Sequence, residues 1–414
     1  MEKVGYAIIG FGGIAENRIA KEGFGLDRTR FNGHPEAELI GATDINKARK
    51  AAATALDLKW YASTEELLND PRIQAVFIAT NNLSHAPLAE QAIKTHRHCI
   101  IEKPFATNLK DAQKVQRLAE KNGISITVDH MMTDNVYNIR ARDLVKQGVI
   151  GQVNDICLHM EFLYGSTPQE AATWRCASPD ELGGPIGDVA SHCLYMAEFL
   201  LDSQVDSLAC VYTPRTLNIN VENGAFIQFK LHPVRETIMP VQGRRKRLSH
   251  GVKGTVRVAF NQPRGGLEST LTNLGYEIYG TKGVIRGYGT LFQLSGHAGE
   301  PVDVRLEIDT PAAAGASLSP RKRGTVETTD YADYTEKITN QKSVKSVKSV
   351  VRIKKVQNIY QAVISKHARS IIDKKPLGAT EAIHNLRLIL TCHESAKQDG
   401  KTIRMPGYRS KNDK

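Results

Sequence analysis

The chain has 414 residues, of which 41% are hydrophobic and 24% charged, as in an ordinary folded protein of two or three domains. No run approaches the roughly 18 apolar residues that a membrane-spanning helix needs, so none is predicted. The net charge of +11 would suit a nucleic-acid-binding protein, but the excess gathers in stretches without interleaved aromatic residues, namely 243–253, 321–323, 342–355 and the RSKNDK tail. We interpret these stretches as solvated surface loops and expect no nucleic-acid partner.

The first residues indicate the compartment, and the spacing of the cysteines bears on metal and redox sites. MEKVGYAIIGFGG has neither the basic start nor the longer apolar core of a secretory signal, so we expect a cytoplasmic protein. The cysteines contain no CxxC pair, and we therefore predict neither a metal site nor a redox motif. The six are Cys99, Cys157, Cys176, Cys193, Cys210 and Cys392.

Short apolar runs of strand type recur through the first 130 residues. They lie at 4–10, 37–44, 75–80, 98–104 and 124–130. Helical patterns such as APLAEQAIKTH and LKDAQKVQRLAEKNG separate the later runs. This alternation predicts βαβ units and a parallel sheet covered on both faces. Residues 1–130 are therefore predicted to form a doubly wound α/β domain of the Rossmann type.

The pattern changes after residue 130. A helical stretch leads into longer β-type runs, including VNDICLHMEFLY, GAFIQFKLH and YEIYGTKGVIRGYG, which are separated by turns and not by helices. Such runs predict an α+β domain over 131–414 with a large, mostly antiparallel sheet. The segment 312–355, with its partial repeat SVKSVKSV, is predicted to be an insertion or an extended loop. Two helical stretches close the chain.

A glycine-rich turn follows the first predicted strand and opens a helix. GFGGIA has the form G-x-G-x-x-A, which is typical of dinucleotide-binding turns because its glycines allow a tight turn and the approach of a pyrophosphate. Glycines also occur in α/β turns that bind nothing. The candidate cofactor-binding residues here are Gly10, Phe11, Gly12, Gly13, Ile14 and Ala15.

An acidic residue ends the second predicted strand. Asp44, followed by Ile45, can accept hydrogen bonds from ribose hydroxyls, and its charge would repel a 2′-phosphate, which favours NAD over NADP. Lys47 and Arg49 stand close enough in sequence to keep NADP open. The spacing from Gly10 exceeds the usual ~20 residues, and we attribute the excess to an insertion near 21–33.

Polar residues follow the next strands, where an open α/β sheet binds its ligands. Lys103, in the tripeptide Glu102-Lys103-Pro104, could hydrogen-bond a substrate hydroxyl, although a surface salt bridge would also explain it. The further cofactor candidates at these strand ends are Thr80, Asn81, His85, Glu102 and Lys103.

The stretch GGPIGDVASH, residues 183–192, holds an acid and an imidazole four residues apart. If Asp188 opens a helix, both side chains lie on one face, where the carboxylate can orient His192 and raise its basicity. A helix N-cap and a core histidine would give the same spacing.

Together these segments resemble the Gfo/Idh/MocA oxidoreductases, the family of glucose–fructose oxidoreductase and inositol dehydrogenase. The resemblance rests on GFGGIA, ATNNLSHAP, EKP, GGPIGDVASH and YEIYGTKG in that order. It implies that Lys103, Asp188 and His192 are catalytic, with His192 as the acid/base. Pro185 interrupts the usual glycine-rich entry to the helix. VDHMMTD replaces a common asparagine–histidine–arginine arrangement, so we assign no role to Asp129 or His130.

Three further residues are candidates for substrate binding. Tyr164 follows the first strand of the second domain, and Trp174-Arg175 precede GGPIG. An aromatic face beside an arginine suits a sugar ring, so Lys103, Asp188 and His192 would share the substrate with these three residues. Local packing or capping explains the three equally well.

The resemblance implies an NAD-dependent dehydrogenase that oxidises a secondary hydroxyl of a sugar, glycoside or cyclic polyol. A redox-neutral glycosidase that uses tightly bound NAD for transient oxidation is the alternative enzyme. A non-enzymatic sensor or polyanion binder is a third hypothesis, which salt-sensitive nucleic-acid binding would reveal. The resemblance also implies a homodimer or homotetramer.

Overall fold

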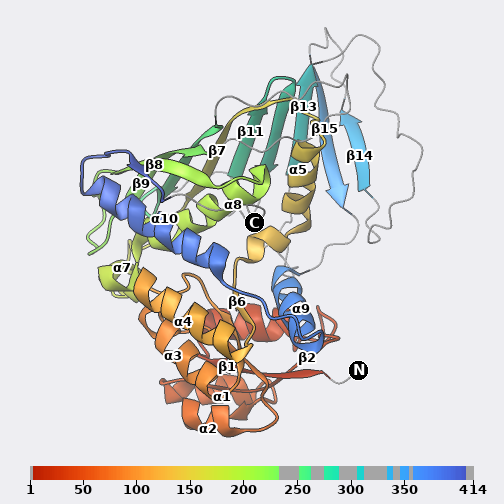
Figure 1. The fold of residues 1–414 in the computed structure, drawn as a ribbon, viewed down its shortest axis with the longest axis vertical. Helices are drawn as coiled ribbons and strands as arrows, with labels where there is room; N and C mark the ends of the chain where they lie inside the picture. The colour runs from red at the N-terminus through yellow and green to blue at the C-terminus, as the bar shows by residue number, and fades with distance from the viewer. Residues whose placement is uncertain are drawn as a thin grey trace.

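The protein has two parts, each built on its own sheet. The computed structural model describes residues 3–232, 251–262, 275–288, 305–311, 333–338, 346–353 and 358–406. A smaller, parallel sheet lies at one end of the molecule and a larger sheet at the other, with α5, α8, α9 and α10 between them (Figure 1). The predicted fold class, a doubly wound domain followed by an α+β domain, is confirmed.

The first sheet has six strands in the order β3-β2-β1-β4-β5-β6, and every neighbouring pair is parallel. Its central strands are buried along their whole length because helices cover both faces. The predicted runs correspond to five strands, and β3 is an additional two-residue strand at the edge. The bounds are β1 Val4–Ile9, β2 Ala37–Thr43, β3 Lys59–Trp60, β4 Ala75–Ile78, β5 His98–Ile101 and β6 Ile126–Val128.

Helices follow most of these strands. Side-chain caps fix several starts: Ser63 accepts from the Glu66 amide and Asn108 from the Asp111 amide, so one otherwise unpaired amide is satisfied at each end. The helix that follows the glycine turn, η1, is a π-helix. The bounds are η1 Ala15–Gly23, η2 Lys47–Arg49, α1 Lys50–Thr54, α2 Thr64–Asn69, α3 Asn82–Lys94 and α4 Leu109–Asn122.

The second sheet has ten strands in the order β14-β15-β13-β12-β11-β7-β10-β9-β8-β16. Only the β7–β10 pair is parallel among the pairs described, so the sheet is mostly antiparallel as predicted. The bounds are β7 Val153–Glu161, β8 Val205–Tyr212, β9 Gly224–Leu231, β10 Lys253–Ala259, β11 Gly275–Gly280, β12 Gly283–Tyr288, β13 Arg305–Pro311, β14 Asp333–Ile338, β15 Ser346–Ile353 and β16 Ile403–Arg404.

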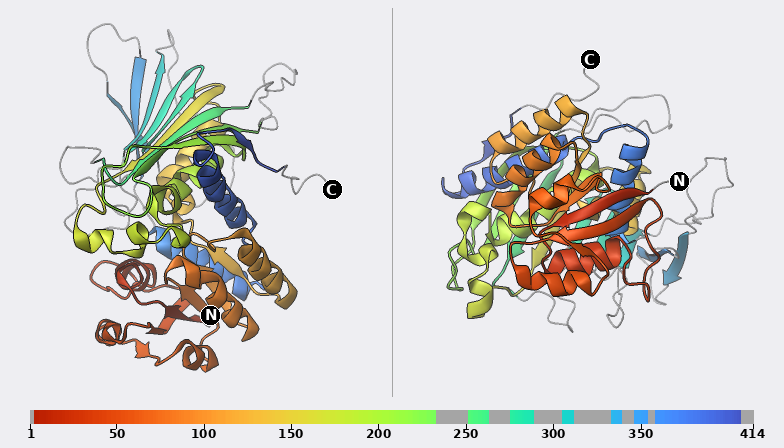
Figure 2. Two further views of the ribbon diagram at one scale, coloured as in Figure 1. Left: turned by 90° about the vertical axis from the view of Figure 1, so that its left-hand side faces the viewer. Right: turned by 90° about the horizontal axis from the view of Figure 1, so that it is seen from below.

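The helices α5, α8 and α10 pack on one face of the second sheet, which Figure 2 shows edge-on. The face that they cover is the one turned toward the first domain. The bounds in this part are η3 Met131–Asp134, α5 Val136–Lys146, α6 Pro168–Ala171, α7 Trp174–Ala177, η4 Pro179–Glu181, η5 Ile186–Ala190, α8 Ser191–Leu201, α9 Ile359–Ile372 and α10 Thr380–Ala396.

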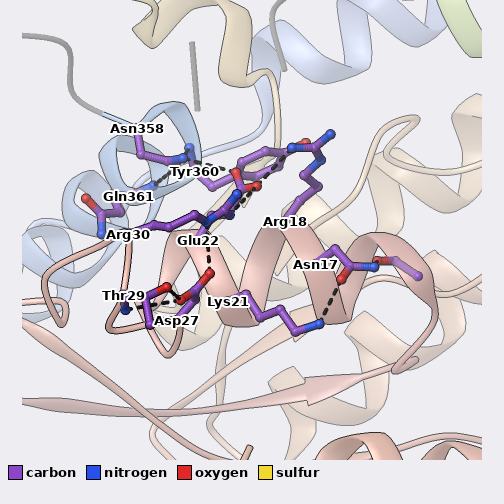
Figure 3. A network of polar contacts seen from close by, with 11 residues as sticks. Asn17, Arg18, Lys21, Glu22, Asp27, Thr29, Arg30, Asn358, Tyr360 and Gln361 are labelled. Carbon is purple, nitrogen blue, oxygen red and sulfur yellow. Dashed lines mark hydrogen bonds and ion pairs between the residues drawn. The ribbon is translucent and has the colours of Figure 1, made fainter. Parts of the chain in front are cut away.

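The helix α9, which precedes the last helix α10, returns to the first domain, where it packs against η1, β1 and β2. Glu22, whose side chain is fully buried, joins these elements (Figure 3). Its carboxylate accepts from Arg18 at 2.9 Å, from Arg30 at 3.3 Å and from Asn358 at 3.2 Å. Asn358 also caps α9, because its Oδ1 accepts from the Tyr360 amide. The predicted insertion near 21–33 therefore supplies contacts that join α9 to η1.

Several of the segments singled out in the sequence lie only partly within the described residues. Within 312–355, predicted as an insertion or extended loop, two strands, β14 and β15, extend the second sheet beyond β13. The other residues of that segment, the basic stretches 243–250 and 321–323 and the tail lie outside the described residues. Among the helices that the structure describes, none is long and apolar enough to cross a membrane.

Candidate functional site

The glycine turn after β1 leaves open space for a ligand. Gly10 has φ of +91°, and a Cβ there would lie 2.7 Å from Thr80 Cγ2, so only glycine fits. A Cβ added at Gly12 or Gly13 would meet no atom within 4 Å. The backbone there is thus accessible, and η1 begins directly behind it at Ala15. A pyrophosphate at this helix start would find the open approach that such a turn requires.

Apolar side chains are exposed around this turn. Ile14 is 41% exposed, Ile45 fully exposed and Leu83 47% exposed, and they follow β1, β2 and β4 respectively. Phe11, by contrast, is fully buried. Apolar side chains that converge at the carboxyl ends of a parallel sheet are typical of a ligand site. The turn and its apolar surroundings fit a dinucleotide.

Asp44 and Arg49 stand beside the same turn. Asp44 is half-buried and accepts a hydrogen bond from the Asn46 amide at 2.7 Å. Arg49 donates from Nε to the Phe11 carbonyl at 2.7 Å and forms an ion pair with Glu16. The guanidinium is therefore already engaged by groups of this domain, while Asp44 keeps acceptor capacity.

The polar residues after β4 contact a loop of the second domain. Glu181 accepts from the Asn81 side chain and, at 2.7 Å, from the Leu83 amide, so it caps the start of α3. His85 is fully buried, and its ring nitrogens lie 2.8 Å from the Pro104 carbonyl and 3.2 Å from the Thr80 carbonyl. This geometry favours a structural role for His85 over direct contact with a cofactor.

Lys103, at the end of β5, reaches into the second domain. Its Nζ donates to Asp188 Oδ1 at 2.9 Å and to the Asp188 carbonyl at 2.5 Å. Arg175 Nε lies 3.5 Å from the same Oδ1. Burial would raise the pKa of Asp188, but Lys103 and Arg175 outweigh it and hold that pKa well below the usual range. Asp188 is thus a carboxylate held between two cations.

His192 lies on α8 and does not pair with Asp188. Its Nδ1 lies 2.7 Å from the Tyr195 hydroxyl. The element η5, Ile186–Ala190, is a single turn of π-helix and is called the π-turn below. Its hydrogen bonds span i to i+5, so residues four apart no longer align as they do in an α-helix. Asp188 is directed toward Lys103 instead. Burial and the charge of Lys103 hold the pKa of His192 well below its usual value.

Two carboxyl groups lie behind Lys103, that of the buried Asp129 and that of the half-buried Glu102. Asp129 is fully buried after β6, and neither of its oxygens makes a well-formed hydrogen bond. Burial raises the pKa of Asp129, and the neighbouring Glu102 raises it further. Burial likewise raises the pKa of Glu102. Because two carboxylates close together repel each other, ionising both of them costs free energy.

The loop that presents Asp188 is held by a residue that precedes strand β9. Glu222, just before β9, accepts from the Ile186 amide at 2.8 Å. Gly184 has φ of +85°, and a Cβ there would lie 2.5 Å from Glu222 Oε1. The glycines before Pro185 therefore let the loop approach this carboxyl closely. Burial raises the pKa of Glu222 to about 7.

The three predicted substrate residues lie near one another. Arg175 stacks 4.5 Å above the Trp174 ring and contacts Asp188. The Tyr164 hydroxyl lies 3.2 Å from Thr173 Oγ1, next to Trp174 in the chain. An aromatic ring, a guanidinium and a hydroxyl are thus gathered beside the Lys103–Asp188 pair.

The structure brings Lys103, Asp188 and Arg175 into contact and places His192 on the adjoining helix. It adds residues that the sequence analysis did not assign. Tyr195 could have been found from its position three residues after His192, on the same helical face. Glu181 and Glu222 have no such local signal, because their partners are distant in sequence, and Asp129 has none because its burial depends on the tertiary fold. Within the described ranges, no group of three or more potential ligands could hold a metal ion.

Comparisons with known proteins agree with this architecture. Residues 4–130 match the model of the GFO_IDH_MocA oxidoreductase family, NAD-binding Rossmann fold, and residues 139–286 match the GFO/IDH/MocA C-terminal domain. The 1,5-anhydro-D-fructose reductase of Ensifer adhaerens is 26% identical over 285 residues, covering 68% of this chain and 77% of the relative. The glucose-6-phosphate 3-dehydrogenase of Bacillus subtilis is 26% identical over 49% of this chain and 55% of its own.

Solved structures share the fold over nearly the whole chain. A levoglucosan dehydrogenase in complex with NADH and L-sorbose has a TM-score of 0.70 at 16% identity, covering 99% of this chain and 100% of its own. The WlbA dehydrogenase of Bordetella pertussis, in complex with NADH and UDP-GlcNAcA, has a TM-score of 0.66 at 17% identity, with coverages of 98% and 100%. At these identities the likeness concerns the fold.

Both matched regions belong to one family, and together they cover most of the two domains described above. The chain is a member of the GFO/IDH/MocA family of NAD-binding oxidoreductases.

Proposed function

We propose that this protein is an NAD-dependent dehydrogenase that oxidises a secondary hydroxyl of a sugar, glycoside or cyclic polyol. The observation that carries the proposal is the contact between Lys103 of the first domain and Asp188 of the second, 2.9 Å apart, next to the buried His192. A cation, a carboxylate and an imidazole beside a dinucleotide-type turn are the groups that alcohol oxidation needs. Relatives named for acting on anhydrofructose and glucose 6-phosphate support a carbohydrate substrate.

In this proposal the protein's own groups move one proton. A bound nicotinamide cofactor would supply the acceptor for the hydride of the carbinol carbon. Lys103 polarises the hydroxyl oxygen, and His192 accepts the hydroxyl proton at Nε2, because Nδ1 is engaged by Tyr195. Asp188 holds the Lys103 ammonium in place and balances its charge. Proton transfer of this kind contributes about 10²–10⁴-fold to the rate.

The cofactor would lie across the glycine turn and the strand ends. We assign its pyrophosphate to the turn and its adenosine ribose to Asp44 and Ile45. An engaged Arg49 and a carboxylate at position 44 favour NAD over NADP. The residues assigned to the cofactor are Gly10, Phe11, Gly12, Gly13, Ile14, Ala15, Asp44, Ile45, Thr80, Asn81, Glu102 and Lys103. We retain His85 only as a support for this region.

Tyr164, Trp174 and Arg175 would bind the substrate together with Lys103, Asp188 and His192. The stacked Trp174–Arg175 pair offers an apolar face and donors to ring hydroxyls. The redox-neutral glycosidase is a weaker alternative, because the relatives compared above are named as dehydrogenases and reductases.

We also propose self-association through the second sheet. Val211 of β8 and Phe226 of β9 are cross-strand neighbours, 45% and 36% exposed, so their side chains lie side by side on one sheet face. A pair of exposed apolar side chains on a sheet face suits a homodimer or homotetramer contact. All six cysteines carry free thiols, which favours the reducing cytoplasm.

The test is the nicotinamide absorbance of purified protein mixed with NAD and a panel of sugars, glycosides and inositols. Formation of reduced cofactor with one class of compound is the expected result. Consumption of a glycoside without net reduction would support the glycosidase instead. If all three classes leave both the cofactor and the compounds unchanged, the proposed substrate range is wrong.

A further inference from the structure

Tyr195 occupies the place at His192 that the sequence assigned to Asp188. Its hydroxyl lies 2.7 Å from His192 Nδ1, and the two rings meet edge to face at 5.5 Å between centroids. Asp188, four residues before His192, is committed to Lys103 and Arg175. We propose that Tyr195 is the positioning residue for His192, which holds the imidazole so that Nε2 is the nitrogen presented to substrate. This inference rests on the proposed role of His192 as acid/base.

The tyrosine is itself fixed from a second element. Its ring stacks on His130 with centroids 4.3 Å apart and planes 18° apart, and His130 follows β6 of the first domain. Tyr195 as a whole is only 5% exposed. A hydroxyl on a ring that is stacked and buried cannot swing away from Nδ1 without breaking core packing. The His192 orientation is therefore set by both domains.

A phenol partner has a chemical consequence. In contrast to a carboxylate, a hydroxyl can either accept from Nδ1–H or donate to a bare Nδ1. When His192 takes the substrate proton at Nε2, the ring carries two N–H groups, and Nδ1–H donates to the Tyr195 oxygen. In the reverse direction the same proton returns from Nε2 to the carbonyl oxygen. The same pair thus serves oxidation and reduction, and in net oxidation the proton held at Nε2 passes to solvent before the next turnover.

The charged surroundings of His192 fit this arrangement. Lys103 after β5 disfavours the imidazolium, Asp188 of η5 favours it, and His130 after β6 disfavours it. Tyr195 of α8 adds no charge. A neutral partner therefore leaves His192 uncharged and ready to accept a proton at neutral pH, in contrast to an ion pair with a carboxylate.

The chain contains a matched control for this contact. The Tyr6 hydroxyl also lies 2.7 Å from a histidine Nδ1, that of His367, in a fully buried setting between β1 and α9. Tyr195→Phe and Tyr6→Phe therefore remove the same hydrogen bond at the same distance. Both variants keep the aromatic ring and, in the case of Tyr195, the stack on His130.

We expect Tyr195→Phe to lower kcat about 10–100-fold while substrate KM and the NAD Kd change less than about twofold. Both variants are expected to lower the thermal midpoint by similar amounts, because each loses the same hydrogen bond. Tyr6→Phe is expected to leave kcat unchanged. An equal loss of kcat in both variants, or none in Tyr195→Phe, overturns the proposal. Either result would mean that the contact serves only stability.

A second measurement does not depend on turnover. In protein labelled with ¹⁵N-histidine, the His192 signals can be assigned by their loss in His192→Gln. We expect Tyr195→Phe to shift the His192 Nδ1 resonance, and Tyr6→Phe to leave it in place. An unchanged Nδ1 resonance in Tyr195→Phe overturns the positioning role. A shifted resonance in a protein that reduces no NAD supports the contact while rejecting the proposed function.

Discussion

Lys103 and Asp188 belong to different domains and are 85 residues apart, yet Lys103 Nζ lies 2.9 Å from Asp188 Oδ1. Each side chain is 12% exposed. The lysine comes from a strand end of the parallel sheet and the aspartate from a π-turn that faces it. The candidate site therefore forms only where the two domains meet, so contacts that hold the domains together also maintain its geometry.

Replacing Lys103 by alanine tests the proposed role of its ammonium group. The change removes the cation that pairs with Asp188 and polarises the hydroxyl, so we expect turnover to fall by at least about 10²-fold. NAD binding, to which the glycine turn and Asp44 are proposed to contribute more than Lys103 does, should stay within about threefold. Steady-state kinetics with calorimetric NAD binding measures both.

A suitable control for that variant is Lys114→Ala, which removes an exposed lysine of α4 that forms an ion pair with Glu90 of α3. Normal turnover in Lys103→Ala would contradict the assignment of Lys103 to the reaction. Loss of NAD binding together with turnover would instead place the lysine in the cofactor site alone.

Replacing Asp44 by serine tests cofactor choice. The serine keeps a short polar side chain but removes the charge that would repel a 2′-phosphate, so NAD should bind about tenfold more weakly and the preference over NADP should narrow. The ratio of kcat/KM for the two cofactors is the measurement. An unchanged ratio would mean that Asp44 does not contact the ribose and that the choice is made elsewhere.

The sequence was most informative where a signal is local. The apolar runs predicted five strands of the first sheet, because strands buried on both faces are continuous in hydrophobicity. Gly10 was recognisable because a single residue type satisfies its backbone conformation. The additional strand β3 was missed because it is two residues long.

Pairings between distant segments could not be predicted in the same way. The spacing of Asp188 and His192 suggested a bonded pair, but a π-turn redirects Asp188 to Lys103 and leaves His192 to Tyr195. Periodicity does not reveal a π-turn, since its cause is tertiary packing around Glu222 and the glycines before Pro185. Glu181 shows the same limit, because its partners on α3 are about 100 residues away.

Acid should destabilise the protein through its buried histidines. Burial lowers the pKa of His130 and His367 to about 3 and that of His393 to about 4. Between these values and 6.5, the unfolded chain binds protons that the folded chain does not, so stability is full above pH 6.5 and falls as pH falls. Each histidine contributes up to about 1.4 kcal/mol per pH unit.

Chemical denaturation at pH 7, 6 and 5 measures this slope. We expect His367→Gln to reduce the slope by about one proton, although the variant also loses the contact with Tyr6. The exposed His96 provides the control, since its replacement by asparagine should leave the slope unchanged. Equal slopes in His367→Gln and the parent protein would show that His367 titrates normally in the folded state.

Glu222 predicts the opposite pH dependence at the loop that presents Asp188. Burial raises its pKa from 4.5 to about 7, so the folded chain retains a proton that the unfolded chain has lost between these values. Its contribution to stability is therefore complete below about pH 4.5 and falls as the pH rises to 7. Glu222→Gln keeps an oxygen for the Ile186 amide and removes the titration. The variant should gain stability over the parent as pH rises from 5 to 8, measured as the difference in thermal midpoint, whereas the exposed Glu381→Gln should not.

Because the Ile186 amide opens the turn that carries Asp188, the parent should also lose kcat over this pH range more steeply than Glu222→Gln. If the two midpoints run parallel with pH, Glu222 is ionised throughout, and the turn is held by a permanent charge.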